Sequence, residues 1–437
     1  MADIRFITLD PGHFHAALVQ KEMYAAVAPQ VHVYAPLGAD LIAHLQRLAG
    51  FNSRPTQPTA WQLEVHAAPD FLERLLREKP GNVVILSGRN ACKIDYLQAA
   101  VGAGLHVLAD KPWIIEAADL PRLQDVLDRA DAQGLIAYDI MTERYEITNM
   151  LQRELVNDAE VFGAPVAGDD QNPGVRMDSV HFLCKAVAGA PLRRPAWFFD
   201  IRQQGEGLSD VGTHLVDLTA WCLFPDQALD YRQDIRILSA RRWPTKMTSA
   251  DFQRVTGESV FPDFLAEHVH DGQLDYFCNT FIAYTLRGIQ VQMNVLWDYE
   301  SAGGGDTHMA SFRGSRARVE IHQGAEQNYR PELYVVANEE KDRNSLAAAL
   351  RRRVVAWQQE VYPGVDVVEE QARWWITIPD RYRVGHEAHF AEVTRRFLAY
   401  LHQPSSLPTW EKPNMLAKYH VTTEGVAVAR RQGSSTG

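Results

Sequence analysis

A lysine and a histidine–aspartate group are the residues of this sequence whose types and spacing suit catalysis best. Lys111 stands in Ala-Asp-Lys-Pro-Trp at positions 109–113, directly after an apolar run that is typical of a buried strand. The crevice at the carboxyl ends of parallel strands is where such sheets bind ligands, and Pro112 fixes the backbone beside the lysine. A lysine on a solvated helix face would not follow such a strand. We therefore predict that Lys111 lies in the active site, in the crevice at the end of its strand.

Asp210, His214 and Asp217 form the second group. In a helix, their i, i+4, i+7 spacing would place all three on one face, beside an apolar stripe. Partial burial next to a carboxylate is how a histidine is tuned to act as an acid or base near neutral pH. Two other interpretations stay open, a purely structural pair and a pair of metal ligands. Because spacing identifies no third or fourth ligand, we predict no metal site.

The elements that position these residues follow two patterns, and the first third of the chain alternates strands with helices. Apolar runs predict strands at 4–9, 31–35, 83–86, 105–109 and 135–139, with helices at 14–27 and 93–101. This alternation is typical of βαβ units and a parallel sheet. We predict an α/β, Rossmann-type doubly wound domain over residues 1–145.

After this domain the pattern changes to a period of two. Apolar and polar residues alternate over 289–295 and over 316–322, which indicates antiparallel strands with one buried face and one wet face. The wet face is a candidate lining for a ligand cleft. Helices are expected at 344–360 and 386–401. We predict an α+β domain over 146–437 with an open-faced, mainly antiparallel sheet.

The loop after the first strand is only partly a phosphate loop. It reads Asp-Pro-Gly-His-Phe-His at positions 10–15, so Gly12 alone remains of the three glycines in GxGxxG. Gly12 is the glycine that lets the backbone approach a pyrophosphate closely, but the same segment also suits an ordinary turn without a ligand. No acidic residue closes the second strand, since Asp40 comes late, and no arginine is placed for a 2′-phosphate. NAD and NADP therefore both remain open.

Composition limits the classes of partner. The chain has 437 residues, which favours two domains, and a net charge of −11, which argues against nucleic acid. Its four cysteines lie far apart, with neither zinc-knuckle nor disulfide-scaffold spacing. Neither a signal peptide nor a membrane-spanning run is recognisable, so we expect a cytoplasmic protein with no membrane partner. An open sheet with one uncovered face favours a homodimer or higher homo-oligomer.

With these motifs the chain resembles the Gfo/Idh/MocA oxidoreductases, which include glucose-fructose oxidoreductase and inositol dehydrogenase. The family pattern AxxAGxHVxxEKP recurs within residues 99–112, with Asp110 in place of the usual glutamate. The family's glycine-rich D-x-G-x-H-x-x-D motif recurs over 205–217, and the strand-pair pattern over 312–320. In the loop at 87–93, Asn90 is kept and Lys93 replaces the family's histidine. Residues 331–380 resemble an insertion, and the whole resembles a poorly characterised branch of the family.

The resemblance implies an NAD(P)-dependent oxidoreductase acting on a hydroxyl of a sugar, glycoside or cyclitol. It implies that His214 is the base, that Lys111 stabilises the alkoxide and that Asp210 orients both. The implied substrate contacts are Lys111, Arg144, Asp210 and His214. The implied contacts to NAD or NADP are Pro11, Gly12, His13, Ser87, Gly88, Arg89, Asn90, Asp110 and Lys111.

Two alternatives remain at this stage. Some members of this family use NAD transiently, so that a glycoside is cleaved or isomerised without net reduction of the cofactor. The eroded glycine loop is also compatible with a non-catalytic protein that binds a dinucleotide or a sugar. Retention of Lys111, Asp210 and His214 together weighs against the second alternative, because a binding protein has no need of all three.

Overall fold

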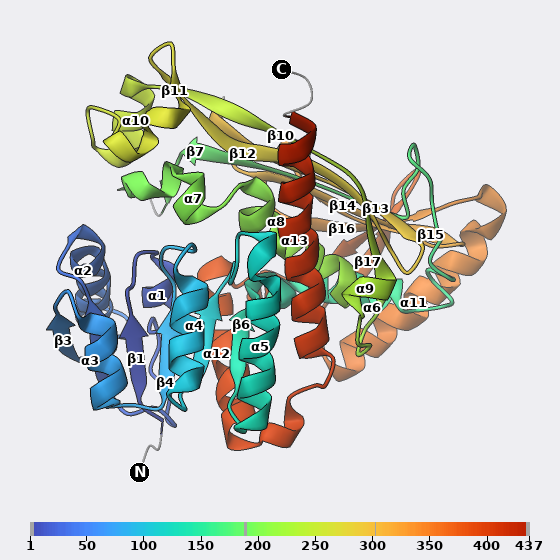
Figure 1. Cartoon of the computed structure of the whole chain (residues 1–437). Helices are drawn as coiled ribbons and strands as arrows, with labels where there is room; N and C mark the ends of the chain where they lie inside the picture. Colours follow the sequence, from blue (N-terminus) through green and yellow to red (C-terminus); the bar gives the residue numbers. More distant parts are fainter. Residues whose placement is uncertain (1–3, 188–189, 302, 434–437) are drawn as a thin grey trace.

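The computed structural model describes residues 4–187, 190–301 and 303–433. These form two large sheets with helices around them (Figure 1) and a small two-stranded sheet of β8 (Ala186–Val187) and β9 (Ala190–Pro191). The first sheet has six parallel strands in the order β3-β2-β1-β4-β5-β6. This is the doubly wound order of dinucleotide-binding domains, so the predicted Rossmann-type domain is confirmed. Its strands are β1 (Phe6–Leu9), β2 (Gln30–Ala35), β3 (Gln62–Ala67), β4 (Val83–Leu86), β5 (His106–Asp110) and β6 (Ala137–Ile140).

Successive residues of these buried strands face two different helix layers. Val84 and Leu86 pack with α3, α4, α5 and α13, whereas Val83 and Ile85 pack with α12 and the segment of α1. Strands buried on both faces need such continuous apolar runs, which is why the sequence revealed them. The helices of this domain are α1 (His15–Leu18), α2 (Ala39–Ser53), α3 (Phe71–Glu78), α4 (Lys93–Gly102) and α5 (Leu120–Ala132).

The last two helices of the chain, α12 (His386–His402) and α13 (Glu411–Gly433), also pack against this first sheet. Phe390 and Phe397 of α12 share a core with Phe6, and Tyr419 of α13 shares one with Leu9. The first sheet ends at β6, so the predicted boundary near residue 145 separates the two sheets but not their covering helices. An amphipathic pattern shows that a helix has a buried face, not which sheet it covers.

The second sheet has ten strands, in the order β10-β12-β13-β7-β14-β15-β16-β18-β17 with β11 paired to β12. Only the β13–β7 pair is parallel, apart from which the sheet is antiparallel as predicted. Residues 331–380 supply its last three strands and α11. The main strands are β7 (Val175–Cys184), β10 (Ile235–Thr248), β11 (Val269–His270), β12 (Gln273–Leu286), β13 (Ile289–Glu300), β14 (Thr307–Arg313), β15 (Ala317–Gln323), β16 (Glu332–Ala337), β17 (Asp366–Glu369) and β18 (Trp374–Thr377), and the other helices are α6 (Ile147–Val156), α7 (Ile201–Gln204), α8 (Gly207–Leu223), α9 (Tyr231–Asp234), α10 (Ser249–Thr256) and α11 (Arg343–Glu360).

The buried face of this sheet packs on α8. Met293 and Val295 of β13 share a core with Leu208 and Leu215 of α8, so the alternate polar residues such as Gln292 lie on the opposite face. The predicted catalytic helix therefore covers the buried face, and the wet face that we expected as a candidate cleft lining lies on the side away from Asp210 and His214. The helix itself is confirmed, and it lies so close to β12 that a Cβ on Gly207 would be 1.9 Å from the Cys278 carbonyl oxygen.

One predicted helix is much shorter than expected. Of the helix predicted over 14–27, only the four residues of α1 form. Beyond it, the Val19 carbonyl accepts a hydrogen bond from the Tyr24 hydroxyl at 2.9 Å, and the Gln20 carbonyl accepts one from Trp61 Nε1 at 2.7 Å. These side-chain donors occupy carbonyls that a longer helix would need for its own bonds.

Candidate active site

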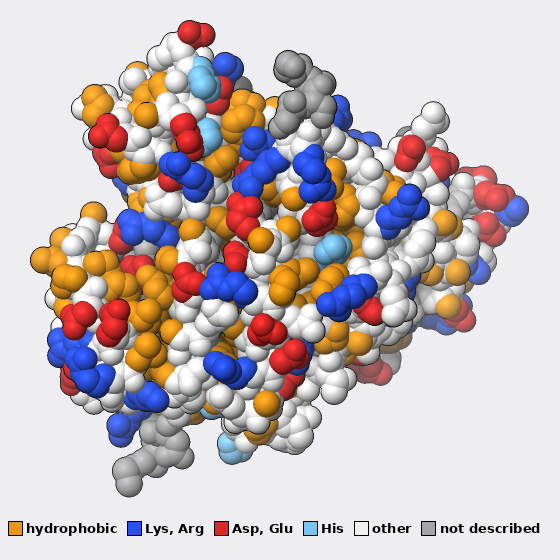
Figure 2. All heavy atoms as spheres, in the orientation of Figure 1, with side chains coloured by type: hydrophobic (Ala, Val, Ile, Leu, Met, Phe, Trp, Pro, Cys, Tyr) orange, Lys and Arg blue, Asp and Glu red, His pale blue; other side chains and the backbone are white. Residues whose placement is uncertain are grey.

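The loops after β1 and β4 meet at the point where the strand order reverses. The His13 amide donates to the Ser87 carbonyl at 3.1 Å. A Cβ on Gly12 would lie 3.4 Å from the Cα of Gly88 and 3.2 Å from Cζ2 of Trp197, which comes from the second domain. In Figure 1, α7 of the second domain lies over this edge of the sheet, and the surface is notched at the left where the two lobes meet (Figure 2). The predicted cofactor loops therefore lie at the interface of the domains.

Asp110 is the centre of a buried polar cluster beneath these loops. One of its carboxylate oxygens lies 2.9 Å from His15 Nδ1 and 3.5 Å from His13 Nδ1, and it accepts a hydrogen bond from Ser87 Oγ at 2.9 Å. Burial by itself raises the pKa of Asp110, but the two histidines and their hydrogen bonds hold it well below its usual range. Three residues of the predicted or adjoining motifs, His13, His15 and Ser87, thus converge on the carboxylate of Asp110.

The same cluster is a set of donors able to hold a metal ion. The ligand atoms of His13, His15 and Asp110 lie within 4.8 Å of one another, and imidazole with carboxylate is a donor set that transition metals accept. Sequence spacing missed this group because His15 and Asp110 are 95 positions apart. Among the described residues, Asp210 and His214 belong to no such group, which removes support for the metal-ligand interpretation of that pair.

Lys111 and Asp210 are joined directly. Lys111 Nζ donates to Asp210 Oδ1 at 2.6 Å and to the Asp210 carbonyl at 3.1 Å. Burial would lower the pKa of Lys111, but the carboxylates of Asp210 and Asp110 raise it above its ordinary value. For Asp210, burial acts upward and Lys111 more strongly downward, so its pKa falls to about 2. At neutral pH the two residues are therefore an ammonium and a carboxylate.

His214 lies one helical turn beyond Asp210. Its Nδ1 is buried without a hydrogen-bond partner in the described part of the chain, which leaves Nε2 as the nitrogen able to meet a ligand. Burial and the positive charge of Lys111 lower the pKa of His214 to about 4, although Glu143 and Asp217 act in the opposite direction. The sequence led us to expect a histidine tuned near neutrality. The structure gives one that is firmly neutral at pH 7 and free to accept a proton.

Glu143 is a site residue that the sequence did not reveal. It lies in the short helix η2 (Thr142–Tyr145), 3.2 Å from Nδ1 of His386 on α12. Burial acts to raise the pKa of Glu143, but His386, His214 and His389 together lower it far below its usual range. His308 of β14 is also near Glu143, and burial lowers its pKa to about 4. The site thus holds more acid–base groups than the predicted trio.

Lys93 is buried and supports the backbone of the candidate site through its hydrogen bonds. Its Nζ donates to Asn90 Oδ1 at 2.7 Å, to the Asp110 carbonyl at 2.7 Å and to the Pro112 carbonyl at 2.8 Å. An ammonium has three hydrogens, so all its donors are used. Burial lowers the pKa of Lys93 to about 8. Lys93 therefore fixes the backbone on both sides of Lys111, which gives a physical role to its replacement of the family's histidine.

Contacts between the domains engage Asn90, Arg89 and Asp40. Asn90 Nδ2 donates to the Gln204 carbonyl at 2.7 Å. Asp40 Oδ2 accepts from Trp197 Nε1 at 3.0 Å and from Arg89 Nη2 at 3.2 Å, and it lies 3.5 Å from where a Cβ on Gly12 would be. Although Asp40 comes late after β2, α2 returns it to the cofactor loop, which the sequence alone did not show.

Arg144 is a predicted substrate contact, but its guanidinium is already bound by two carboxylates of the protein. Its guanidinium donates to both carboxylate oxygens of Asp217 at 2.7 Å and to Glu411 at 2.9 Å and 3.0 Å. Lys418 of α13 lies 3.1 Å from Asp217 and 2.8 Å from Asp139. These groups form a buried ion network between η2, α8 and α13. Arg144 therefore holds the helices of the site together, and we no longer propose it as a substrate contact.

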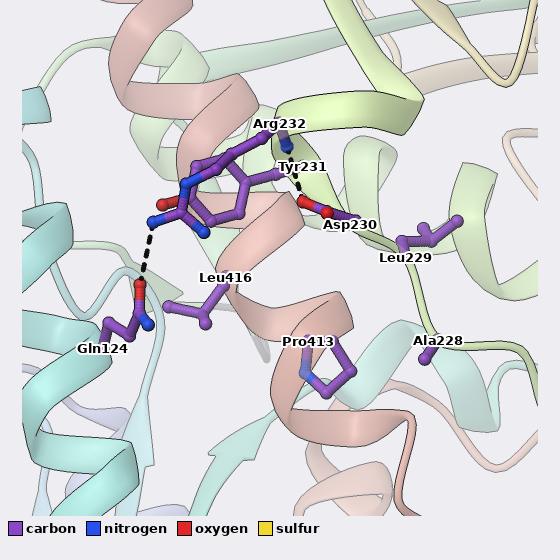
Figure 3. A pocket seen from close by; sticks show the side chains of 8 residues that line it. All are labelled: Gln124, Ala228, Leu229, Asp230, Tyr231, Arg232, Pro413 and Leu416. Atoms are coloured by element: carbon purple, nitrogen blue, oxygen red, sulfur yellow. Dashed lines mark hydrogen bonds between the residues drawn. The ribbon is translucent and has the colours of Figure 1, made fainter.

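A separate pocket of about 300 Å³ lies away from these residues (Figure 3). It is formed by α5, α9 and α13, with Arg232 and Gln124 hydrogen-bonded at 3.2 Å across it. None of the predicted site residues lines it. No helix among the described residues is long and apolar enough to cross a membrane.

The family described as "Putative oxidoreductase C terminal domain" matches residues 151–430. A crystal structure of a putative oxidoreductase from Parabacteroides merdae ATCC 43184 is 45% identical, with 99% of this chain and 98% of that chain covered and a TM-score of 0.96. No curated protein matches the chain significantly in sequence.

Two more distant structures share the fold. GenD2 from gentamicin A biosynthesis, in complex with NAD, is 15% identical, with 100% of this chain and 96% of that chain covered and a TM-score of 0.59. KijD10, a 3-ketoreductase from Actinomadura kijaniata in complex with NADP and TDP-benzene, is 14% identical, with 98% and 97% covered and a TM-score of 0.57. Both chains are matched along almost their whole length, so the arrangement of two domains is common to all three proteins.

Proposed function

The chain belongs to the Gfo/Idh/MocA family of oxidoreductases, and from that premise we propose that it is an NAD(P)-dependent enzyme acting on a hydroxyl of a sugar, glycoside or cyclitol. The observation that carries this proposal is the 2.6 Å pair of Lys111 and Asp210, with His214 one turn further along α8. The pair adjoins the crevice at the end of β5, where ligands bind in doubly wound sheets.

The residues around the switch point suit a dinucleotide. Gly12 presents backbone without a side chain there, and His13 Nδ1 lies 3.5 Å from the Asp110 carboxylate at the same edge. The proposed contacts are Pro11, Gly12, His13, Ser87, Gly88, Arg89, Asn90, Asp110 and Lys111. The complexes of GenD2 with NAD and of KijD10 with NADP are consistent with this assignment. When bound, the nicotinamide supplies the position that accepts or returns a hydride.

The protein's own groups manage the proton and the charge. His214, neutral at pH 7, takes the proton of the reacting hydroxyl at Nε2 as the carbon loses its hydride. Lys111 stabilises the negative charge that develops on that oxygen. Asp210 holds Nζ of Lys111 in place and keeps it protonated. In the reverse direction, His214 returns the proton and a ketone becomes an alcohol.

The test begins with the purified protein. Binding of NADH and NADPH is measured by fluorescence, and a panel of sugars, glycosides and cyclitols is then screened for a change in nicotinamide absorbance. We expect binding of at least one cofactor and turnover of at least one polyol. Full turnover by both Lys111→Ala and His214→Asn would show that the assignment of the site is wrong.

A second candidate function is transient oxidation followed by cleavage or isomerisation of a glycoside. The observation that favours it is the extra acid–base equipment of the site, since Glu143 and His308 are more than a simple dehydrogenation requires. A ketone next to a C–H bond makes that proton removable, and a second carboxylate is suited to removing it. Product analysis with a catalytic amount of NAD separates the two functions, because only the second gives a cleaved or isomerised product without accumulating NADH.

A further inference from the structure

Arg194 is a buried cation that the proposed reaction does not use. It lies just before the short helix η3 (Ala196–Phe199) and is 8% exposed. Its Cζ lies 4.6 Å from the ring centroid of Phe198 and 5.1 Å from that of Trp297. Its Nε donates to the Leu183 carbonyl at 3.3 Å. Two rings and one carbonyl thus fix the guanidinium in place.

No carboxylate neutralises this guanidinium within the described part of the chain. The carboxylates that interact with it electrostatically are those of Asp210 and Asp306. Asp210 is held by Lys111, and Asp306 lies 2.6 Å from Lys185 and 3.0 Å from His181. Since each aspartate is already engaged by a lysine, neither is a dedicated counter-charge of Arg194. A buried charge without a partner is unfavourable, so this arrangement is suited to an incoming anion.

The free edge of Arg194 has the form that an oxyanion requires. Its two terminal nitrogens make no hydrogen bond among the described residues, and neither nitrogen is completely buried. An arginine held in this way presents two parallel N–H groups, which match the two oxygens of a carboxylate or phosphate. The edge is therefore polar and not fully enclosed by the protein.

Arg194 also lies on the substrate side of the site. It interacts electrostatically with Asp210, the partner of Lys111. The ring of Trp297 on β13 that flanks Arg194 lies 4.9 Å from the ring of His181 on β7, so this wall belongs to the second sheet. Contact with the cofactor loop is made instead by Trp197, whose ring lies beside Gly12. A group bound at Arg194 would thus lie between the reacting centre and the second sheet.

On the basis of the proposed function, we propose that Arg194 binds an oxyanion group of the substrate, so that the enzyme acts on acidic sugars in preference to their neutral counterparts. A carboxylate and a phosphate share this chemistry. The site selects its substrate by a bidentate contact to Arg194, while Lys111 and His214 act on a hydroxyl of the same sugar.

The experiment compares acidic and neutral sugars on the full-length protein with NADH bound. The probes are glucuronate, galacturonate and mannuronate, then glucose 6-phosphate, galactose 6-phosphate and mannose 6-phosphate, and finally the neutral glucose, galactose and mannose. Affinity is measured by calorimetry and by the shift in Tm. The variants are Arg194→Gln, Arg194→Lys and, as a matched control, Arg193→Gln, since Arg193 is the exposed neighbour.

We expect at least one acidic sugar to bind more tightly than its neutral counterpart. We expect Arg194→Gln to lose roughly 10- to 100-fold of that affinity, as for a hydrogen-bonded charge pair. Arg194→Lys should recover part of the loss, and Arg193→Gln should resemble the wild type. The uronates and the phosphates distinguish the two forms of oxyanion.

Three results would overturn the inference. They are binding of none of the acidic sugars, equal binding of acidic and neutral sugars, and an unchanged preference in Arg194→Gln. A loss of NADH affinity in Arg194→Gln would instead assign the residue to the cofactor diphosphate and also contradict the inference. Retained NADH binding shows that the variant is folded. Failure of the proposed function is distinct, because then neither cofactor binding nor redox turnover is seen with any sugar.

Discussion

Lys111 Nζ lies 2.6 Å from Asp210 Oδ1, although the two residues are 99 positions apart and belong to different domains. Lys111 follows the last residue of β5, and Asp210 is in the first turn of α8. Each residue is the counter-charge of the other, so the pair forms only when the sheet edge and the helix face each other. The contact therefore couples the geometry of the reacting centre to the packing of the two domains.

Lys111→Ala should lower kcat by about 10²- to 10³-fold, the usual effect of removing one group that stabilises an oxyanion. NADH binding should persist, because the other cofactor contacts remain. Steady-state kinetics and NADH fluorescence check this on the substrate found in the screen. The exposed Lys341→Ala is the matched control, and it should have wild-type kcat. A loss of kcat in the control as large as that of Lys111→Ala would contradict a specific role for Lys111.

The pH dependence of kcat/KM should reflect His214. Because burial and Lys111 lower the pKa of His214 to about 4, the neutral base predominates above that pH. Oxidation should therefore lose activity as the pH falls through about 4, where His214 becomes protonated, and it should lack a limb near pH 6.5. His214→Asn should lose this acidic limb and lower kcat by about 10²- to 10⁴-fold. If the acidic limb persists in His214→Asn, His214 is not the base, and Glu143 is the next candidate for that role.

Asp40 should set the preference between the two cofactors. A carboxylate beside Gly12 repels the 2′-phosphate of NADP, so we expect the wild type to prefer NAD. Asp40→Ala removes that charge and frees Arg89, now 3.2 Å from Asp40, to meet a phosphate. The ratio of the Kd values for NADH and NADPH should shift toward NADPH by roughly tenfold. The double variant Asp40→Ala/Arg89→Gln should reverse much of this gain, whereas an unchanged ratio in Asp40→Ala would show that the ribose lies elsewhere.

Local sequence patterns were sufficient for five of the six strands of the first sheet, for β13 and β15 of the second sheet, and for α8. The strands around Val84 and Val107 are buried on both faces and therefore read as continuous apolar runs. The spacing of Asp210 and His214 correctly predicted one face of α8. The pairing of Lys111 with Asp210 was expected from the family motifs, since no rule of spacing links residues in different domains.

Contacts distant in sequence were not predictable in this way. Glu143 has no local pattern that distinguishes it, and its role depends on α12 bringing His386 to it. Asp40 was set aside because it does not close β2, yet α2 returns it to Gly12. Arg144 was expected to contact the substrate, but its partners Asp217 and Glu411 lie in other segments and become visible only in the fold.

Arg144 should prove to be a stability residue and not a substrate contact. Arg144→Ala leaves Asp217 and Glu411 with less compensating charge in a buried network, and breaking such a pair costs about 3–5 kcal/mol. Urea unfolding should report that loss, and Arg144→Lys should recover part of it. At a temperature where the variant remains folded, its KM should be unchanged. An increase in KM without a loss of stability would restore the substrate role predicted from the sequence.

Lys93 should make the stability of the protein depend on pH in the alkaline range. Its pKa is about 8 in the folded protein, below the ordinary 10.5, because it is buried. Between these two pH values the unfolded chain binds more protons at Lys93 than the folded protein does. The free energy of unfolding therefore rises with pH, by at most about 1.4 kcal/mol per pH unit. Lys93→Met lacks the titrating group and should lack this rise. Urea unfolding of both proteins at pH 7.5, 8.5 and 9.5, with the exposed Lys246→Met as control, measures the difference.

Because Lys93 also holds the backbone on both sides of Lys111, the variant should lower kcat as well. Equal pH slopes in wild type and Lys93→Met would contradict a buried, cationic Lys93.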